Sequence, residues 1–467
     1  MKAHGNCCEL SHFLLRHFMK KKFTYIILLV LFFGTSAFVV LRYNHSIKNK
    51  LNAFYPMLDR KGVLAKSAEW QSIKSNAENL IRVVRDNPQD KKSMLALATL
   101  YVQEGRASGN FNYYDKAALH YIDAHLERDV NDFQALTLKS LVQLSQHHFA
   151  DGLITAEKAK NINPYNAFVY GLLVDGNVEM GNYKEAVKNS DKMVSIRPDI
   201  RSYSRISYLR EIHGDYPGAI EAMQMAVDAG VYGDEPTSWA RIQLARLFEN
   251  TGDMKAAEMH YTIALNERPG YAYAIAGLGK IALWKKDYAK SISLFTQADG
   301  LIPDGYFKEQ LAQAYLLSGN EKKANEFLNK VADEINNTVQ AAAKDENAAH
   351  HADAELAHIY LLLKDYDKAL THATNEYNRR PDNIDVNALM AWTYYKLGET
   401  KEALPYLARA LRTDSKNPTL LCQAGLIYYS SGDKQKARTL WQNALQKNPN
   451  IDVLLKEECK KYLSTMI

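Results

Sequence analysis

Residues 418–451 read PTLLCQAGLIYYSSGDKQKARTLWQNALQKNPNI, and the two preceding segments, 350–383 and 384–417, keep the same spacing of 34 residues without an insertion. Small residues recur at corresponding places in these segments: Gly398 and Gly432, and Ala369, Ala403 and Ala437. A fixed period of this length is typical of repeat proteins, in which each unit stacks on its neighbours and none buries its apolar face alone. The repeat therefore indicates a solenoid.

Each unit is predicted to form two antiparallel helices. The recurring alanines lie where the two helices must approach closely, and Gly432 ends the first helix because a positive φ angle costs glycine little. Asp433 follows this glycine as an N-cap of the second helix. Prolines that disfavour helix at the preceding residue close the second helices once per unit: Pro164, Pro198, Pro269, Pro303, Pro381 and Pro449.

The last unit resembles the tetratricopeptide repeat (TPR) closely. The residues that carry the resemblance are Ala424, Gly425, Tyr428, Gly432, Asp433, Ala437, Trp441, Ala444 and Pro449. The resemblance implies an all-α fold, a right-handed TPR superhelical solenoid of about ten helical hairpins. It also implies an inner, concave groove lined by the first helix of each unit.

The rest of the chain is divided around this array. We expect a short basic segment at 1–22, a transmembrane helix at 23–42 and a tether at 43–66. The array then comprises a degenerate first repeat or cap at 67–90, TPR repeats at 91–337, a helical insertion at 338–349, three regular repeats at 350–451 and a capping helix at 452–467. Atypical terminal repeats are expected because the ends of a solenoid need a polar outer face.

The apolar segment 23–41 reads FTYIILLVLFFGTSAFVVL and contains no charged residue. As a helix it would span about 28 Å, which matches the hydrocarbon core of a bilayer. A cleaved signal peptide is the alternative, since Thr35-Ser36-Ala37 resembles a cleavage site and Lys20–Lys22 form a positive n-region. The apolar run continues past Ala37, which favours an uncleaved anchor. Met19 is an alternative start.

The charges that flank this segment predict its orientation. Arg16 and Lys20–Lys22 precede the span, while Arg42, Lys48 and Lys50 follow it, so the bias is slight. We expect the amino end to be cytoplasmic. The protein would then be a single-pass protein of the inner membrane with a periplasmic TPR region.

Composition argues against several classes of protein. The net charge is only +5, and Lys and Arg are interleaved with acidic residues, so we expect no nucleic acid partner. Four cysteines without a CxxC motif exclude zinc ribbons and disulfide-built scaffolds. Cys422 and Cys459 are expected to be free thiols, with a bridge between them as the alternative in an oxidising compartment.

No catalytic motif, cofactor site or metal site is expected, and the chain is interpreted as not being an enzyme. The stretch Ala276–Lys280 resembles a phosphate loop, but it falls inside the first helix of a repeat. His350, His351 and His358 are interpreted as a solvated helix face, because 351 and 358 lie about 10 Å apart on one helix. His147 and His148, which occupy a turn between helices, receive the same interpretation.

The first helices carry a set of aromatic and basic residues that the register places in the groove. Aromatic and Arg side chains carry much of the binding energy at interfaces, since they offer large surfaces with few rotors. The candidate partner-binding residues are Tyr208, Trp239, Arg246, Tyr273, Lys280, Trp284, Tyr306, Trp392, Tyr395 and Tyr429. The expected ligand is a protein or peptide, with polysaccharide as an alternative because aromatic rings also stack on sugars.

Anchor and array together suggest a non-catalytic, membrane-anchored scaffold in cell-envelope assembly, secretion or polysaccharide export. This suggestion rests on resemblance to the layout of bacterial membrane-anchored TPR proteins. One alternative is a glycan-binding module of a polymer export system. The other is a cytoplasm-facing regulatory adaptor, although relatives of that kind carry a CxxC pair that this sequence lacks.

Overall fold

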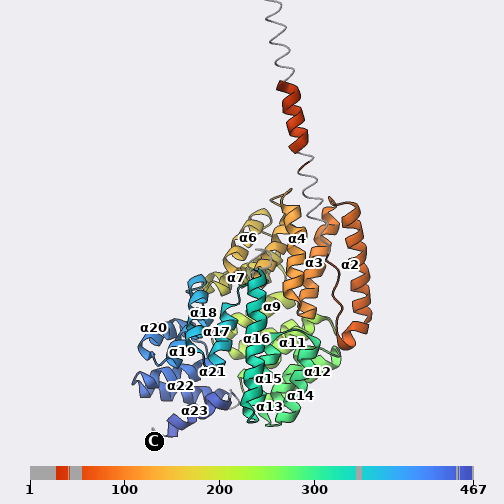
Figure 1. Cartoon of the computed structure of the whole chain (residues 1–467). Coiled ribbons are helices and arrows are strands. Elements are labelled where there is room, and N and C mark those ends of the chain that lie inside the picture. The colour runs from red at the N-terminus through yellow and green to blue at the C-terminus, as the bar shows by residue number, and fades with distance from the viewer. Residues whose placement is uncertain are drawn as a thin grey trace, which may run out of the picture. The chain divides into compact units, whose positions relative to one another are not determined.

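The structure, a computed structural model, describes residues 28–39, 42, 55–342, 350–448, 451 and 453–464. Every regular element within these ranges is a helix (Figure 1). The contacts divide the chain into two units, residues 1–56 with 82–90 and residues 57–81 with 91–467. The repeats from residue 91 onward belong to the second, larger unit.

The helices follow one another as antiparallel hairpins, as the repeat predicts. They are η1 (Gly62–Lys66), α2 (Ala68–Asp86), α3 (Lys91–Ser108), α4 (Phe111–Leu126), α5 (Phe133–Ser145), α6 (Phe149–Ile162), α7 (Ala167–Glu179), α8 (Tyr183–Ile196), α9 (Ile200–Ile212), α10 (Tyr216–Asp228), α11 (Glu235–Asn250), α12 (Met254–Glu267), α13 (Ala272–Trp284), α14 (Tyr288–Leu301), α15 (Gly305–Leu317), α16 (Glu321–Ala342), α17 (Asp353–Leu362), α18 (Tyr366–Arg379), α19 (Ile384–Lys396), α20 (Thr400–Ala410), α21 (Pro418–Ser430), α22 (Lys434–Lys447) and α23 (Val453–Ser464).

The turn inside each hairpin is built as the sequence predicts. Gly398 has a φ of 84° and Gly432 a φ of 96°, so both lie in the left-handed region. Asp433 then caps α22, where its carboxylate accepts a hydrogen bond from the backbone N–H of Lys436 at 3.0 Å. Three such turns place a non-glycine residue in the left-handed region, His147, Lys286 and Lys364, each with a φ of 62°.

Helices within the array approach each other at small residues. Ala437 is completely buried, and a Cβ atom at Gly425 would overlap the indole of Trp441 on the next helix. Gly279 on α13 occupies the equivalent position of an earlier repeat, and its Cβ would lie 3.0 Å from the ring of Phe295. The glycines of the stretch that resembles a phosphate loop therefore serve helix packing.

The larger unit also makes contacts between segments about two hundred residues apart. The backbone N–H of Ile384, at the start of α19, donates to the hydroxyl of Tyr183 on α8 at 2.8 Å. The amide of Asn383 donates to the carbonyl of Glu179 at 3.1 Å. The array thus coils back upon itself, so that its middle and late hairpins touch.

The predicted tether at 43–66 differs from the structure at its carboxyl end. Residues 57–66 belong to the larger unit, and Arg60 among them is only 7% exposed. Its guanidinium donates to the carboxylate of Glu104 at 2.8 and 2.7 Å and to Glu69 at 2.9 Å. The polar composition of residues 43–66 gave no sign of this packing, because the partners of Arg60 lie on α2 and α3.

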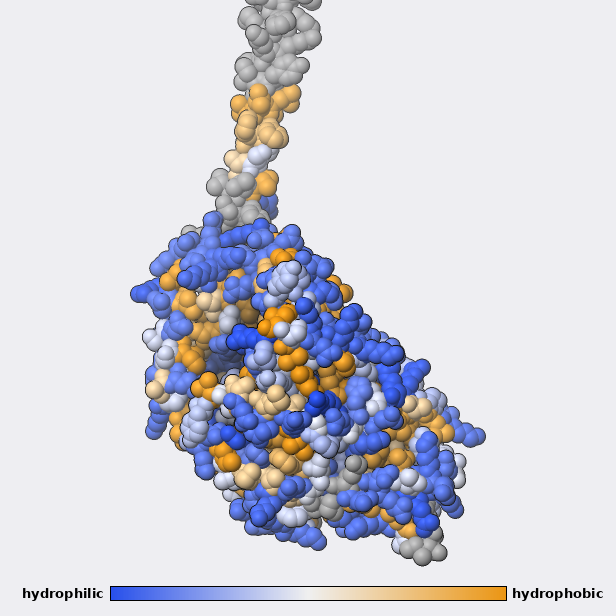
Figure 2. Space-filling view, turned by 180° about the vertical axis from the view of Figure 1, so that it is seen from behind, coloured by the Kyte–Doolittle hydropathy of each residue, from blue (hydrophilic) through white to orange (hydrophobic). Residues whose placement is uncertain are grey.

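Residues 28–39 of the predicted membrane segment form a helix whose large side chains, such as Leu28 and Phe33, are exposed. Figure 2 colours this helix as hydrophobic. Among the described residues, no helix is both long and apolar enough to span a bilayer. Most of the remaining residues of 23–42 lie outside the described ranges, as do the segment 1–22 and residues 343–349 of the predicted insertion.

We expect Ala437→Leu to destabilise the last hairpin. The extra volume has no space beside the buried Ala437, so the substitution should lower the free energy of unfolding by about 1–3 kcal/mol. Ala408→Leu is the matched control, because Ala408 is exposed on α20. Thermal unfolding followed by circular dichroism measures both variants. Equal melting temperatures for the two variants would contradict the assigned register.

Candidate partner-binding cavity

A large cavity lies inside the larger unit. Its volume is about 2060 Å³, and its walls carry side chains from the first helices of successive hairpins, from α3 through α21, and from parts of α2 and of second helices such as α4, α10 and α16. Figure 2 shows a hollow on one face of the molecule, with hydrophobic side chains among hydrophilic ones. Pockets for small molecules commonly measure about 300–1,000 Å³, so this cavity has room for a segment of polymer.

Six of the ten residues predicted for the groove line this cavity. They are Tyr208, Trp239, Arg246, Tyr273, Lys280 and Tyr306. Tyr208 and Trp239 keep 39% and 42% of their surface exposed, so their rings are available to a ligand. Their helices, α9 and α11, contribute adjacent parts of the wall.

Other members of this set are held by hydrogen bonds within the wall. The hydroxyl of Tyr273 donates to Asp304 at 2.8 Å, and the ammonium of Lys280 forms an ion pair with Glu249. Glu249 also accepts a hydrogen bond from the hydroxyl of Tyr261 at 2.9 Å. These contacts fix the positions of the side chains before any ligand arrives.

The other four predicted residues do not line the cavity. Trp284 lies at the end of α13, and the remaining three pack near the last helix. Trp392 stacks on Tyr395 with ring centroids 5.0 Å apart, and the hydroxyl of Tyr395 donates to Glu458 of α23 at 3.4 Å.

Tyr429 meets the same last helix, since its ring lies 4.6 Å from that of Tyr462. Helix α23 thus covers the inner side of the last repeats. Its Cys459 and the neighbouring Cys422 of α21 are buried and not joined by a disulfide in this structure. The sequence placed α23 only as an end cap, and it gave no signal that the cap would use these groove residues.

The carboxylates of the cavity were not predicted from the sequence. Thirteen Asp and Glu residues line it, against six Lys and Arg residues, although the whole chain has a net charge of +5. The excess of acidic residues gives the cavity a negative potential that focuses cations. If the acidic and basic residues at the inward-facing positions of the first helices had been counted separately, the sequence would have shown this excess of carboxylates.

Three of these carboxylates lie within electrostatic reach of Tyr208: Glu179 on α7, Glu211 on α9 and Asp385 on α19. Desolvation within the cavity raises the pKa of Glu211 and of Asp385 above their usual range. Burial raises the pKa of Glu179 to about 7, although Arg380 opposes the shift. The three carboxylates repel one another, so a bound cation would be stabilised among them.

Asp115 on α4 is a buried carboxylate in the same wall, 3% exposed. The hydroxyl of Ser145 donates to it at 2.8 Å. Burial raises the pKa of Asp115 from 3.8 to about 7 because the ionised form loses its hydration.

Two segments of the sequence match family models described as tetratricopeptide repeat, residues 360–418 and residues 418–451. These matches confirm the resemblance of the repeats to the TPR superfamily. No curated protein matches the sequence.

Several solved structures are similar at low identity. Human IFIT1, solved as a dimer with PPP-AAAA, is 14% identical, with a TM-score of 0.43 over 86% of this chain and 99% of that one. Yeast Tom70 is 12% identical, with a TM-score of 0.36 over 91% and 95% of the two chains. The Cut9–Hcn1 complex of the APC/C is 16% identical, with a TM-score of 0.36 over 92% and 74%. Nothing about the function of this chain follows from similarity at this level.

We expect Asp115→Asn to stabilise the protein at pH 8 and to lose most of this effect at pH 4, close to the pKa of the unfolded carboxyl. The folded state holds a proton on Asp115 up to about pH 7, whereas the unfolded carboxyl releases it near 3.8. Stability of the natural protein should therefore rise as the pH falls through this window. The neutral amide removes the cost of the buried charge above pH 7. Melting temperatures at both pH values, with the exposed Asp191→Asn as control, measure the difference; a pH-independent shift would contradict the assignment.

Proposed function

The chain is a member of the tetratricopeptide-repeat superfamily, and from this premise we propose that it is a non-catalytic scaffold whose central cavity binds an extended segment of a partner protein. Repeats of this superfamily serve protein–protein interaction. The observation that carries the proposal is the cavity itself, which is lined in large part by first helices and exceeds the size of a small-molecule pocket.

The charge of the cavity defines the chemistry of the partner. A segment rich in Lys or Arg would be attracted by the excess of carboxylates and would relieve the repulsion between them. Tyr208, Trp239 and Tyr306 line this negatively charged cavity, and each keeps 36–42% of its surface exposed. Aromatic faces attract cations, so rings and carboxylates together favour a basic, extended peptide.

Trp239→Ala should weaken binding of a basic peptide about tenfold, the effect of removing an aromatic hot spot. Trp284→Ala is a matched control, because both tryptophans are 42% exposed and only Trp239 lines the cavity. The probe is a short fluorescein-labelled peptide rich in Lys and Arg, and its dissociation constant is measured by fluorescence anisotropy. A peptide with Glu at the basic positions tests the role of charge.

Two results would overturn this assignment. Equal losses in the Trp239 and Trp284 variants would place the site elsewhere, and equal affinity for the acidic peptide would remove the electrostatic argument. Retention of a neutral oligosaccharide that depends on Trp239, without binding of basic peptides, would instead favour the glycan-binding alternative.

Affinity for the basic peptide should fall as the pH is lowered from 8 to 6. Glu179 has a pKa near 7, so it is charged above this pH and gains a proton below it. A cationic ligand favours the ionised form, which makes binding stronger at higher pH. Anisotropy titrations across this range measure the effect, and Glu179→Gln should reduce the pH dependence. An affinity that rises at pH 6 would contradict the acidic cavity as the site.

We further propose that residues 23–42 anchor the scaffold in the inner membrane, with the repeats in the periplasm, and that the protein acts in envelope assembly, secretion or polysaccharide export. The support is the uncharged sequence 23–41 and the exposed apolar side chains of residues 28–39. The cytoplasm-facing adaptor is the alternative, since the flanking charges differ little.

The full chain should stay in the membrane pellet after an alkaline wash, and a variant that lacks residues 1–42 should be released. The apolar segment supplies the insertion energy, so its loss removes the anchor. A topology reporter fused after Ile467 distinguishes the orientations. A soluble full chain would contradict anchoring, whereas a cytoplasmic reporter on an anchored chain would favour the adaptor.

A further inference from the structure

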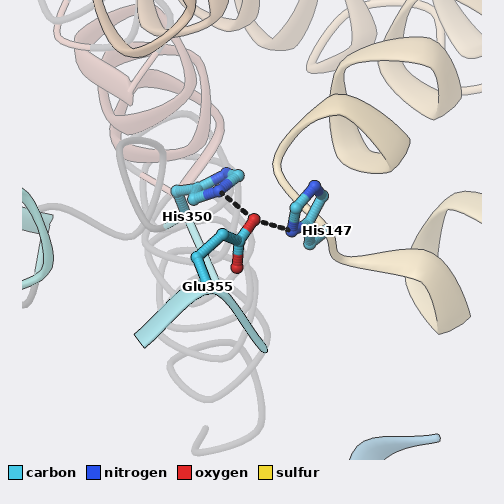
Figure 3. Close-up of side chains that lie close together, drawn as sticks. All are labelled: His147, His350 and Glu355. Carbon is cyan, nitrogen blue, oxygen red and sulfur yellow. Dashed lines mark ion pairs between the residues drawn. The ribbon is translucent and has the colours of Figure 1, made fainter. Parts of the chain in front are cut away.

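Two segments that are far apart in the sequence meet at the wall of the cavity. His147 lies in the turn between α5 and α6, and His350 and Glu355 lie at the start of the α17 region (Figure 3). The Nδ1 atom of His147 is 3.5 Å from the Oε1 atom of Glu355, and the Nε2 atom of His350 is 3.8 Å from the same oxygen. We propose that these three side chains bind a divalent transition-metal ion, of which Zn²⁺ is the best fit.

The spacing of the ligand atoms agrees with such a site. Zinc binds imidazole nitrogen and carboxylate oxygen at about 2.0–2.2 Å, so two ligands of a tetrahedral ion lie about 3.3 Å apart. The measured separations from Glu355 exceed this value by only a few tenths of an ångström, and all three ligand atoms lie within 4.8 Å of one another. Small rotations of the side chains would therefore complete the geometry.

The ligand set also selects the metal. Two imidazoles and one carboxylate suit zinc and related transition ions, whereas Mg²⁺ and Ca²⁺ prefer oxygen ligands. The three side chains remain about one-quarter to two-fifths exposed, at 31% for His147, 26% for His350 and 37% for Glu355. A fourth position facing the cavity would be left for water or for a group of the bound partner.

The backbone holds the two segments side by side. The N–H of His351 donates to the carbonyl of Gln146 at 3.1 Å, and the ring of His148 stacks on that of His351 with centroids 4.2 Å apart. The ring of His147 stacks on Phe149. The ligands are thus brought together by contacts that do not involve the metal, which reduces the cost of ordering them on binding.

One contact must be exchanged when the metal binds. The Nδ1 atom of His147 lies 3.0 Å from the carbonyl oxygen of His351, so in the metal-free protein it donates its proton there. Coordination requires the lone pair of this nitrogen, so the imidazole changes tautomer and carries its proton on Nε2. The loss of one hydrogen bond is small beside the gain of a metal–nitrogen bond to a neutral imidazole.

A positive charge beside this turn, that of Arg380, is already paired with carboxylates. Arg380 lies over the ring of Phe149 at 4.5 Å, but its guanidinium pairs with both Glu179 and Glu376. The carboxylate of Glu355 supplies the negative charge within the ligand set.

A second group of potential ligands, His125, Asp129 and Asp132, is a weaker candidate. Asp132 already caps α5 through the N–H of Ala135 at 2.8 Å, and it forms an ion pair with Lys91. A metal there would have to displace both partners. The choice between the two groups therefore favours His147, His350 and Glu355.

The metal would cross-link two hairpins, because its ligands are separated by about two hundred residues in the sequence. A bound ion would fix the distance between the α5–α6 turn and the start of α17, and so the width of the cavity between them. The metal could also present its open coordination position to a partner in the cavity.

The test uses the purified full chain in detergent, stripped with a chelator and titrated with Zn²⁺ by calorimetry and with Co²⁺ by visible absorption. We expect one ion per chain and the intense absorption of a tetrahedral Co²⁺ site. His147→Ala, His350→Ala and Glu355→Gln should each weaken binding at least about tenfold. His358→Ala is the matched control, because His358 is a histidine of the same helix, α17, outside the ligand set.

Hydrogen exchange provides a second readout that does not depend on the variants. Zn²⁺ should slow exchange of the amide of His351, which donates a hydrogen bond to the carbonyl of Gln146 on the other hairpin. Absence of binding to the natural chain, or equal binding by the His147 and His358 variants, would overturn the proposal. Circular dichroism of each variant separates loss of ligand from loss of fold. The peptide measurements are made without metal, so the two proposals fail independently.

Discussion

The structure of the larger unit depends on the contact between its middle and late hairpins. Arg380 is central to this contact, since its buried guanidinium forms ion pairs with Glu376 on its own hairpin and with Glu179 on α7. Tyr183 and Ile384 add a hydrogen bond nearby. Removal of one partner from a buried ion pair is more costly than the pair is favourable, because the remaining charge stays desolvated. The contact therefore specifies how far the array coils.

Coiling changes the chemistry of the groove. In an open solenoid, carboxylates on the first helices would face water, whereas here desolvation raises the pKa of Glu179 to about 7. The same enclosure sets Tyr208 among carboxylates from three different helices. It also brings His147 beside Glu355. The proposed peptide site and the proposed metal site are thus both consequences of one long-range contact.

The last repeats illustrate a limit of reasoning from register. Aromatic residues such as Trp392 and Tyr429 occupy first helices, as Trp239 does, and the repeat pattern treats them alike. The structure distinguishes them because α23 packs over the last repeats and contacts Tyr395 and Tyr429. The direction that a terminal helix takes after the last hairpin decides which groove residues it covers. The repeat pattern does not encode this direction.

The sequence by itself determined the hairpins, because glycine turns, N-caps and small residues act over a few residues and recur every 34 positions. It also identified part of the cavity wall, including Trp239, since the register alone places first helices inward. Only the tertiary structure decided where distant hairpins meet. The packing of Arg60, the acidic surroundings of Tyr208 and the meeting of His147 with Glu355 all require contacts between separate hairpins. Such contacts follow from small rotations accumulated over many repeats, and one repeat read alone does not reveal them.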